Sequence, residues 1–173
     1  MKTDNTYKKI DGEFKNDLNY LGFFCWNLFE SDFHEIKLEN ILNAELLNEE
    51  FDNLKKNENI ISKIKSSTFG PFDIHKLTKK DFTKLNHIEL ITEIDNYCKD
   101  ENWGNDLPIF KDNIKYVFNK LEFNLSEKEF YYINMETTDN QKLINPNFWS
   151  YFVAIISIEK NSNKIITSYF GLD

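Results

Sequence analysis

The chain has 173 residues, a length that fits one domain. Its 29 acidic residues and 21 lysines, with no arginine, give a net charge of -8. Nucleic-acid-binding proteins neutralise phosphates with clustered Lys and Arg, so this balance argues against direct nucleic-acid binding. Because 40% of the residues are hydrophobic and Phe occurs 16 times, we expect an ordered, aromatic-rich core and not a disordered chain.

The N-terminal part is predicted to be mostly helical. Residues 1–13 are polar, and we expect them to be frayed. Apolar residues between positions 17 and 29 fall at helical spacing and favour a helix, although residues 20–26 fit a buried strand equally well. Residues 38–54 place apolar side chains on one stripe with acids opposite, which indicates an amphipathic helix. Residues 60–64 continue as a short second segment.

A break and a second helix are predicted in the middle of the chain. Gly70 and Pro71 mark the break. Thr78 and Asp81 have the spacing of a capping box, from which we predict a helix that runs to Cys98. The side chains expected to be buried are those at helical spacing: Leu85, Ile88, Ile91, Ile94 and Cys98.

The clearest amphipathic pattern follows the loop that contains Gly104. Asp106 is placed to cap a helix, and Pro108 suits its first turn. Apolar residues then step by three or four from Leu107 to Leu121, which predicts a helix over this range.

Short apolar runs replace the helical pattern after residue 125. Residues 130–135, 148–158 and 164–170 are rich in Tyr, Phe, Ile and Val and are separated by polar turns, which predicts an antiparallel β-meander. The middle run is apolar on both alternations, as in a central strand covered on both faces. One face would carry Trp149, Tyr151, Val153 and Ile155, and the other Phe148, Phe152, Ala154, Ile156 and Ile158. The expected fold is α+β, one domain over residues 1–173 with N-terminal helices packed on a C-terminal antiparallel β-meander.

No motif in the sequence predicts catalysis, a metal or a cofactor. The histidines His34, His75 and His87 lack the spacing of a zinc helix, and there is no glycine-rich phosphate loop. Paired acids are frequent, but in so acidic a chain they are expected by chance. We therefore expect a protein that is not an enzyme and holds no metal or cofactor.

The cysteines and the N-terminus point to a cytoplasmic protein. Cys25 and Cys98 lie in apolar stretches, so we expect buried free thiols, which suit a reducing cytosol. The polar first residues do not resemble a secretory signal, and the apolar run 148–158 is too short to span a bilayer. We expect no membrane association.

Two surfaces are candidates for binding a partner. The segment 100–106 places Trp103 among Asp100, Glu101 and Asp106 on a loop; Trp is enriched at interface hot spots, and acids attract a basic partner. Trp103 could equally cover the core. The second candidate is the strand 130–135, with Tyr131 and Ile133, if it forms a free sheet edge to which a partner strand can pair.

The size, the acidity and an order of helices followed by a meander over residues 149–158 and 164–171 resemble bacterial immunity proteins of the CdiI class, which protect cells against contact-dependent growth inhibition toxins. The resemblance implies that the protein binds and neutralises a cognate toxin domain, typically a basic nuclease, as a monomer or in a 1:1 complex. A small enzyme with a site assembled from distant residues, and an acidic scaffold or nucleic-acid mimic, are the alternatives.

Overall fold

The computed structural model describes residues 7–16, 22–33, 35–44, 46–47, 68–100, 103–125, 127–144 and 146–172. Their centre is one six-stranded antiparallel sheet in the order β1-β2-β8-β7-β6-β5. The strands are β1 (Tyr7–Asn16), β2 (Phe23–Ser31), β5 (Thr83–Leu85), β6 (Lys128–Asn134), β7 (Tyr151–Glu159) and β8 (Lys164–Leu172).

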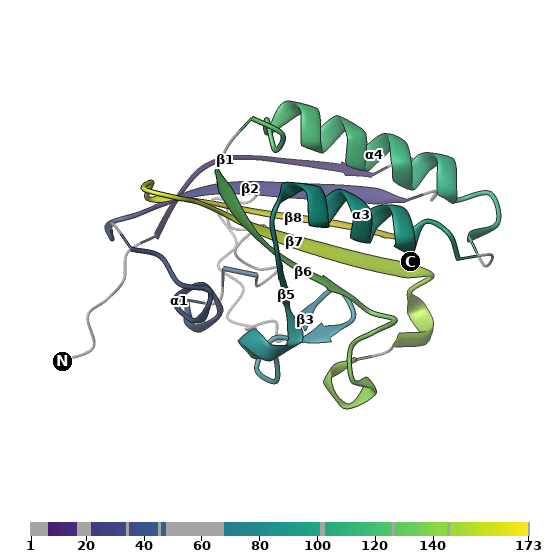
Figure 1. Ribbon diagram of the computed structural model, residues 1–173. Coiled ribbons are helices and arrows are strands. Elements are labelled where there is room, and N and C mark those ends of the chain that lie inside the picture. Colours follow the sequence, from purple (N-terminus) through teal and green to yellow (C-terminus); the bar gives the residue numbers. More distant parts are fainter. Residues whose placement is uncertain are drawn as a thin grey trace, which may run out of the picture.

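Helices cover one face of the sheet, and shorter elements cover the other (Figure 1). The helices α3 (His87–Tyr97) and α4 (Leu107–Lys120) pack on the first face. The opposite face carries α1 (Leu38–Asn43) and the small hairpin of β3 (Thr68–Phe69) and β4 (Phe72–Asp73). Three short 3₁₀ turns complete the described elements: Lys79–Asp81, Asn140–Lys142 and Pro146–Phe148.

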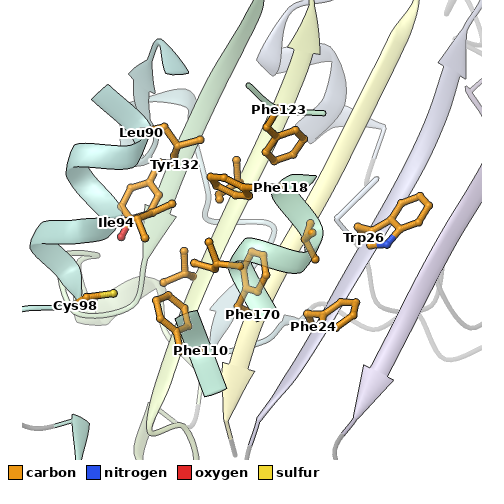
Figure 2. Close-up of a cluster of buried hydrophobic side chains, with 14 of the residues drawn as sticks. Phe24, Trp26, Leu90, Ile94, Cys98, Phe110, Phe118, Phe123, Tyr132 and Phe170 are labelled. Carbon is orange, nitrogen blue, oxygen red and sulfur yellow. The ribbon is translucent and has the colours of Figure 1, made fainter. Parts of the chain in front are cut away.

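Each face of the sheet has its own apolar core. Figure 2 shows part of the helix-side core, where side chains from α3 and α4 meet those of β2, β6 and β8; the labelled residues are Phe24, Trp26, Leu90, Ile94, Cys98, Phe110, Phe118, Phe123, Tyr132 and Phe170. Rings dominate the other core too, where Phe152 of β7 packs against Phe69, Phe72 and Tyr169. Cys25 and Cys98 are buried, and within the described residues neither forms a disulfide, as expected.

The expected α+β fold, with N-terminal helices packed on a C-terminal meander, is wrong, because the described chain is mostly antiparallel β and is built on one six-stranded sheet. The chain starts with the antiparallel pair β1 and β2, and the two longer helices lie in the middle of the chain. The helix favoured over residues 17–29 is a strand from Phe23, because β2 lies between β1 and β8 and buries side chains on both of its faces. Apolar residues on both faces produce helical spacing by coincidence, and residues 17–21 lie outside the described part.

The prediction for the polar N-terminus is also wrong. Residues 7–13 belong to β1, and the expectation that they are frayed is wrong. β1 lies at one end of the strand order, and most of its side chains are exposed, so it needs few apolar residues. Charged residues are typical of such edge strands because they discourage pairing with other chains.

The predicted meander is confirmed. β6, β7 and β8 are antiparallel neighbours, and β7 is buried on both faces from Tyr151 to Ile158. Its alternation divides the side chains between the two cores as predicted over this range. The strand begins at Tyr151, however, so Phe148 is exposed in a 3₁₀ turn and Trp149 packs against the core opposite to the one expected.

The helix before Cys98 starts later than predicted. Asp81 Oδ2 accepts hydrogen bonds from the backbone N and the hydroxyl of Thr78 at 2.7 and 2.9 Å, but this capping box encloses only a 3₁₀ turn. A second box starts α3, where Asn86 Oδ1 accepts from Glu89 N at 3.0 Å. The later start changes the buried face to Leu90, Ile94 and Cys98, while Ile88 and Ile91 are exposed.

The remaining helical predictions have mixed outcomes. α4 confirms the predicted amphipathic helix, with Phe110, Ile114, Val117 and Phe118 buried, although Asp106 makes no side-chain cap. The predicted helix over 38–54 is observed only as the six residues of α1. Its part from position 48 onward and the segment 60–64 lie outside the described residues.

Candidate functional site: an acidic and aromatic pocket

A pocket opens where α3 ends, α4 begins and β7 starts. Its volume is about 220 Å³, and we call it the acidic–aromatic pocket; it is lined by Tyr97, Asp100, Trp103, Asp106, Glu136, Ser150 and Tyr151. In Figure 1 the end of α3 and the start of β7 lie at the end of the sheet nearest the C-terminus. Three separate parts of the chain therefore contribute: the end of α3 with the connection to α4, the segment two residues beyond β6, and the start of β7.

Trp103 forms the inner wall of this pocket. Its ring centroid lies 4.6 Å from that of Phe110 and 4.7 Å from that of Tyr151, and its indole Nε1 donates to the Tyr97 carbonyl at 3.0 Å. Only 9% of the residue is exposed. Trp103 therefore packs into the helix-side core, as one of the two alternatives expected, and the same ring lines the pocket.

Three carboxylates surround the aromatic wall, and among the described residues no lysine or histidine lines the pocket. Glu136 Oε1 accepts a hydrogen bond from the Tyr97 hydroxyl at 2.7 Å. Although much of the Glu136 side chain reaches solvent, burial of the carboxyl group raises its pKa, and the charge of Asp100 adds to the rise. The carboxylate form of Glu136 is therefore destabilised relative to the protonated form.

Tyr151 is a buried polar group without a partner. Its side chain lines the pocket and is only 3% exposed, and its hydroxyl makes no hydrogen bond within the described part of the chain. Burial raises the pKa of Tyr151, and the negative charge of Asp106 raises it further. Buried hydroxyls are nearly always hydrogen-bonded in proteins, so this unpaired group is unusual.

The chemistry of the pocket suits an organic cation. Negative charge comes from Asp100, Asp106 and Glu136, and the carbonyl end of α3 adds a partial negative charge. Aromatic walls favour ammonium and guanidinium groups. Within the described residues no group of three or more His, Cys, Asp or Glu side chains is arranged to hold a metal ion.

The structure brings together three of the six residues predicted to bind a partner: Asp100, Trp103 and Asp106. Glu101 lies outside the described residues. Tyr131 and Ile133 lie elsewhere, on β6, and the expectation of a free edge there is wrong. β5 pairs with β6 over Phe130–Tyr132 on one side and β7 pairs with it on the other, and Ile133 is only 2% exposed.

Comparisons with known proteins add no family. No protein-family model, no curated protein and no solved structure matches the chain. Over the described ranges, no helix has the length and apolar character needed to cross a membrane.

We expect the raised pKa of Glu136 to make the stability of the protein depend on pH. Its folded-state pKa is raised, so its contribution to folding is complete below the unfolded value of about 4.3 and is lost as the pH rises through the folded-state pKa. Glu136→Gln removes this dependence. The free energy of unfolding of the variant relative to wild type should therefore increase from about pH 4 to about pH 7. Urea unfolding at the two pH values measures it, and an unchanged difference would contradict the assignment.

Proposed function

We propose that this protein binds a basic protein partner and holds a lysine or arginine side chain of that partner in the acidic–aromatic pocket. One observation carries the proposal: three carboxylates and buried aromatic rings line the pocket, with no lysine of the described residues among them, in a chain that contains 21 lysines. Such a pocket offers a basic side chain both charge neutralisation and aromatic contact.

The biological role that we propose is neutralisation of a toxin domain in the cytoplasm, as an immunity protein and not as an enzyme. Nuclease toxins must hold phosphates, so their active faces are basic, and an acidic inhibitor complements them. Size and acidity support the resemblance to immunity proteins of the contact-dependent inhibition type. The order of helices before strands, which was part of that resemblance, is not observed and gives no support.

If the protein were an enzyme, we would expect a histidine side chain close to acids or to a thiol. His87, Asp95 and Cys98 do line one groove, between α3 and α4. However, His87 and Cys98 are 11 positions apart on α3 and its C-cap, which separates them by about 16 Å along the helix at 1.5 Å per residue. Burial also raises the pKa of Cys98, which disfavours a reactive thiolate. This groove therefore does not favour an enzyme.

The test of the proposal is co-expression with the product of the adjacent upstream gene, which the proposed role expects to be a toxin. The expected result is a 1:1 complex and growth of cells that otherwise die. Wild-type protein that neither binds nor protects would refute the proposed role.

We expect association with the basic partner to slow markedly as salt rises. At low ionic strength, the net charge of -8 and the acids of the pocket attract a basic partner over a long distance. The Debye length falls from about 30 Å at 0.01 M to about 8 Å at 0.15 M salt. The long-range attraction that speeds association is therefore lost at the higher salt concentration. Stopped-flow mixing at these two salt concentrations measures the association rate. An association rate that does not change would indicate a mainly apolar interface.

A further inference from the structure

We propose a second site, for a phosphate-sized oxyanion, in a cavity between the end of α4 and the strands β6, β7 and β8. The cavity has a volume of about 320 Å³ and receives the lysines Lys120, Lys128 and Lys164 and the hydroxyl-bearing Ser157. It lies apart from the acidic–aromatic pocket and shares no lining residue with it.

Lys128 is the central cation of this cavity. It is half-buried, and its Nζ donates to the Leu121 carbonyl at 3.0 Å and lies 5.4 Å from the ring centroid of Phe123. An ammonium has three N–H groups, and no carboxylate of the described residues lies within ion-pair distance of this one. Burial lowers the pKa of Lys128, and repulsion by Lys164 lowers it further. Glu159 and Glu122 favour its charge from beyond ion-pair distance, so an anion in the cavity would form the direct ion pair that no described carboxylate forms.

Lys164 and Ser157 complete the site from the neighbouring strands. Lys164 begins β8, is exposed, and forms no ion pair with any described carboxylate. Ser157 is 1% exposed, and its hydroxyl has no hydrogen-bond partner among the described residues. A buried hydroxyl without a partner is costly, and an oxyanion in the cavity would accept from it. Two ammonium groups without an ion pair, together with a hydroxyl that has no hydrogen-bond partner, suit an anion with several oxygens.

The other charges of the cavity limit what it can hold. Lys120 already pairs with Glu13 at 3.0 Å and contributes mainly positive potential. Glu122 and Glu159 also line the cavity, and both act favourably on the charge of Lys128. Three lysines against two acids leave the lining with an excess of one positive charge, so a compact anion fits better than a polyanion such as nucleic acid.

Titration of isotope-labelled protein with inorganic phosphate, at constant ionic strength, tests the site. The expected result is saturable shifts of the backbone amides of Ser157, Ile166 and Lys128. Lys164→Gln should weaken binding roughly tenfold, the loss of about 1.4 kcal/mol. Lys160→Gln, in the exposed turn before β8, removes the same charge outside the cavity and should leave phosphate binding unchanged. Because Lys164 is exposed, its variant should fold normally.

A parallel titration with glucose 6-phosphate shows whether the site takes only the oxyanion. Equal affinity for inorganic phosphate and glucose 6-phosphate would indicate that the site contacts only the oxyanion. Tighter binding of glucose 6-phosphate would indicate that the cavity wall also contacts the sugar. The proposal is overturned if neither ligand shifts these amides, if the shifts do not saturate, or if Lys160→Gln weakens binding as much as Lys164→Gln.

Discussion

Replacement of Phe152 by alanine is expected to lower the free energy of unfolding by about 3–5 kcal/mol. The side chain is fully buried on the central strand β7. Its ring centroid lies 5.3 Å from that of Phe69, 5.5 Å from that of Phe72 and 5.2 Å from that of Trp149. Alanine would leave a cavity where the hairpin of β3 and β4 meets the sheet, and the surrounding rings cannot close it without losing their contacts to each other.

Phe148 provides a matched control for this variant. It is the same residue type four positions away, but 74% of it is exposed, so Phe148→Ala should change stability by no more than about 0.5 kcal/mol. Urea unfolding of both variants at one pH measures the difference. If the Phe152 variant unfolds at the same urea concentration as the control, the hairpin does not pack on the sheet as described.

Reversal of the charge at Asp100 and Asp106 together is expected to weaken binding of the basic partner by about 2–5 kcal/mol, mostly through faster dissociation. Both side chains line the acidic–aromatic pocket, and lysines in their place would repel the basic side chain that the pocket is proposed to hold. Asp106 also lies at the N-terminus of α4, where a cation is unfavourable, so circular dichroism must confirm folding first.

The control for this pair changes the net charge equally at a distance from the pocket. Asp112 and Glu127 are exposed and do not line it. Asp112→Lys with Glu127→Lys should slow association at low salt but leave the dissociation rate nearly unchanged. Equal weakening by the two pairs would mean that overall charge, and not the pocket, controls affinity.

Strong local patterns in the sequence predicted part of the fold correctly. α4 shows regular steps of three and four residues, and β7 is apolar on both alternations; both elements were predicted near their observed positions. β2 was assigned to the wrong class because its burial depends on β8, which is about 140 positions away and cannot be recognised from local spacing. β1 is stabilised by pairing along β2 while its side chains stay largely polar, so no apolar pattern indicated it.

The pocket was predictable only where its residues are close in sequence. Asp100, Trp103 and Asp106 share one loop, and their grouping was predicted. Glu136 and Tyr151 reach the same place because β6 ends and β7 begins at this end of the sheet. The antiparallel pairing of these strands was predicted, but their position relative to α3 was not, since it depends on contacts of α3 with β5 and β6.

The most direct test of the central claim uses the indole N–H signals of the three tryptophans. The indole of Trp103 lies in the acidic–aromatic pocket, whereas Trp26 and Trp149 do not line it. The probe is Nα-acetyl-lysine amide, and Nα-acetyl-norleucine amide is the uncharged control of similar shape. We predict a saturable shift of the Trp103 signal with the lysine compound alone, which is lost in Asp100→Asn with Asp106→Asn. Three unchanged signals, or equal shifts with both compounds, would contradict the proposal that this pocket binds a basic side chain.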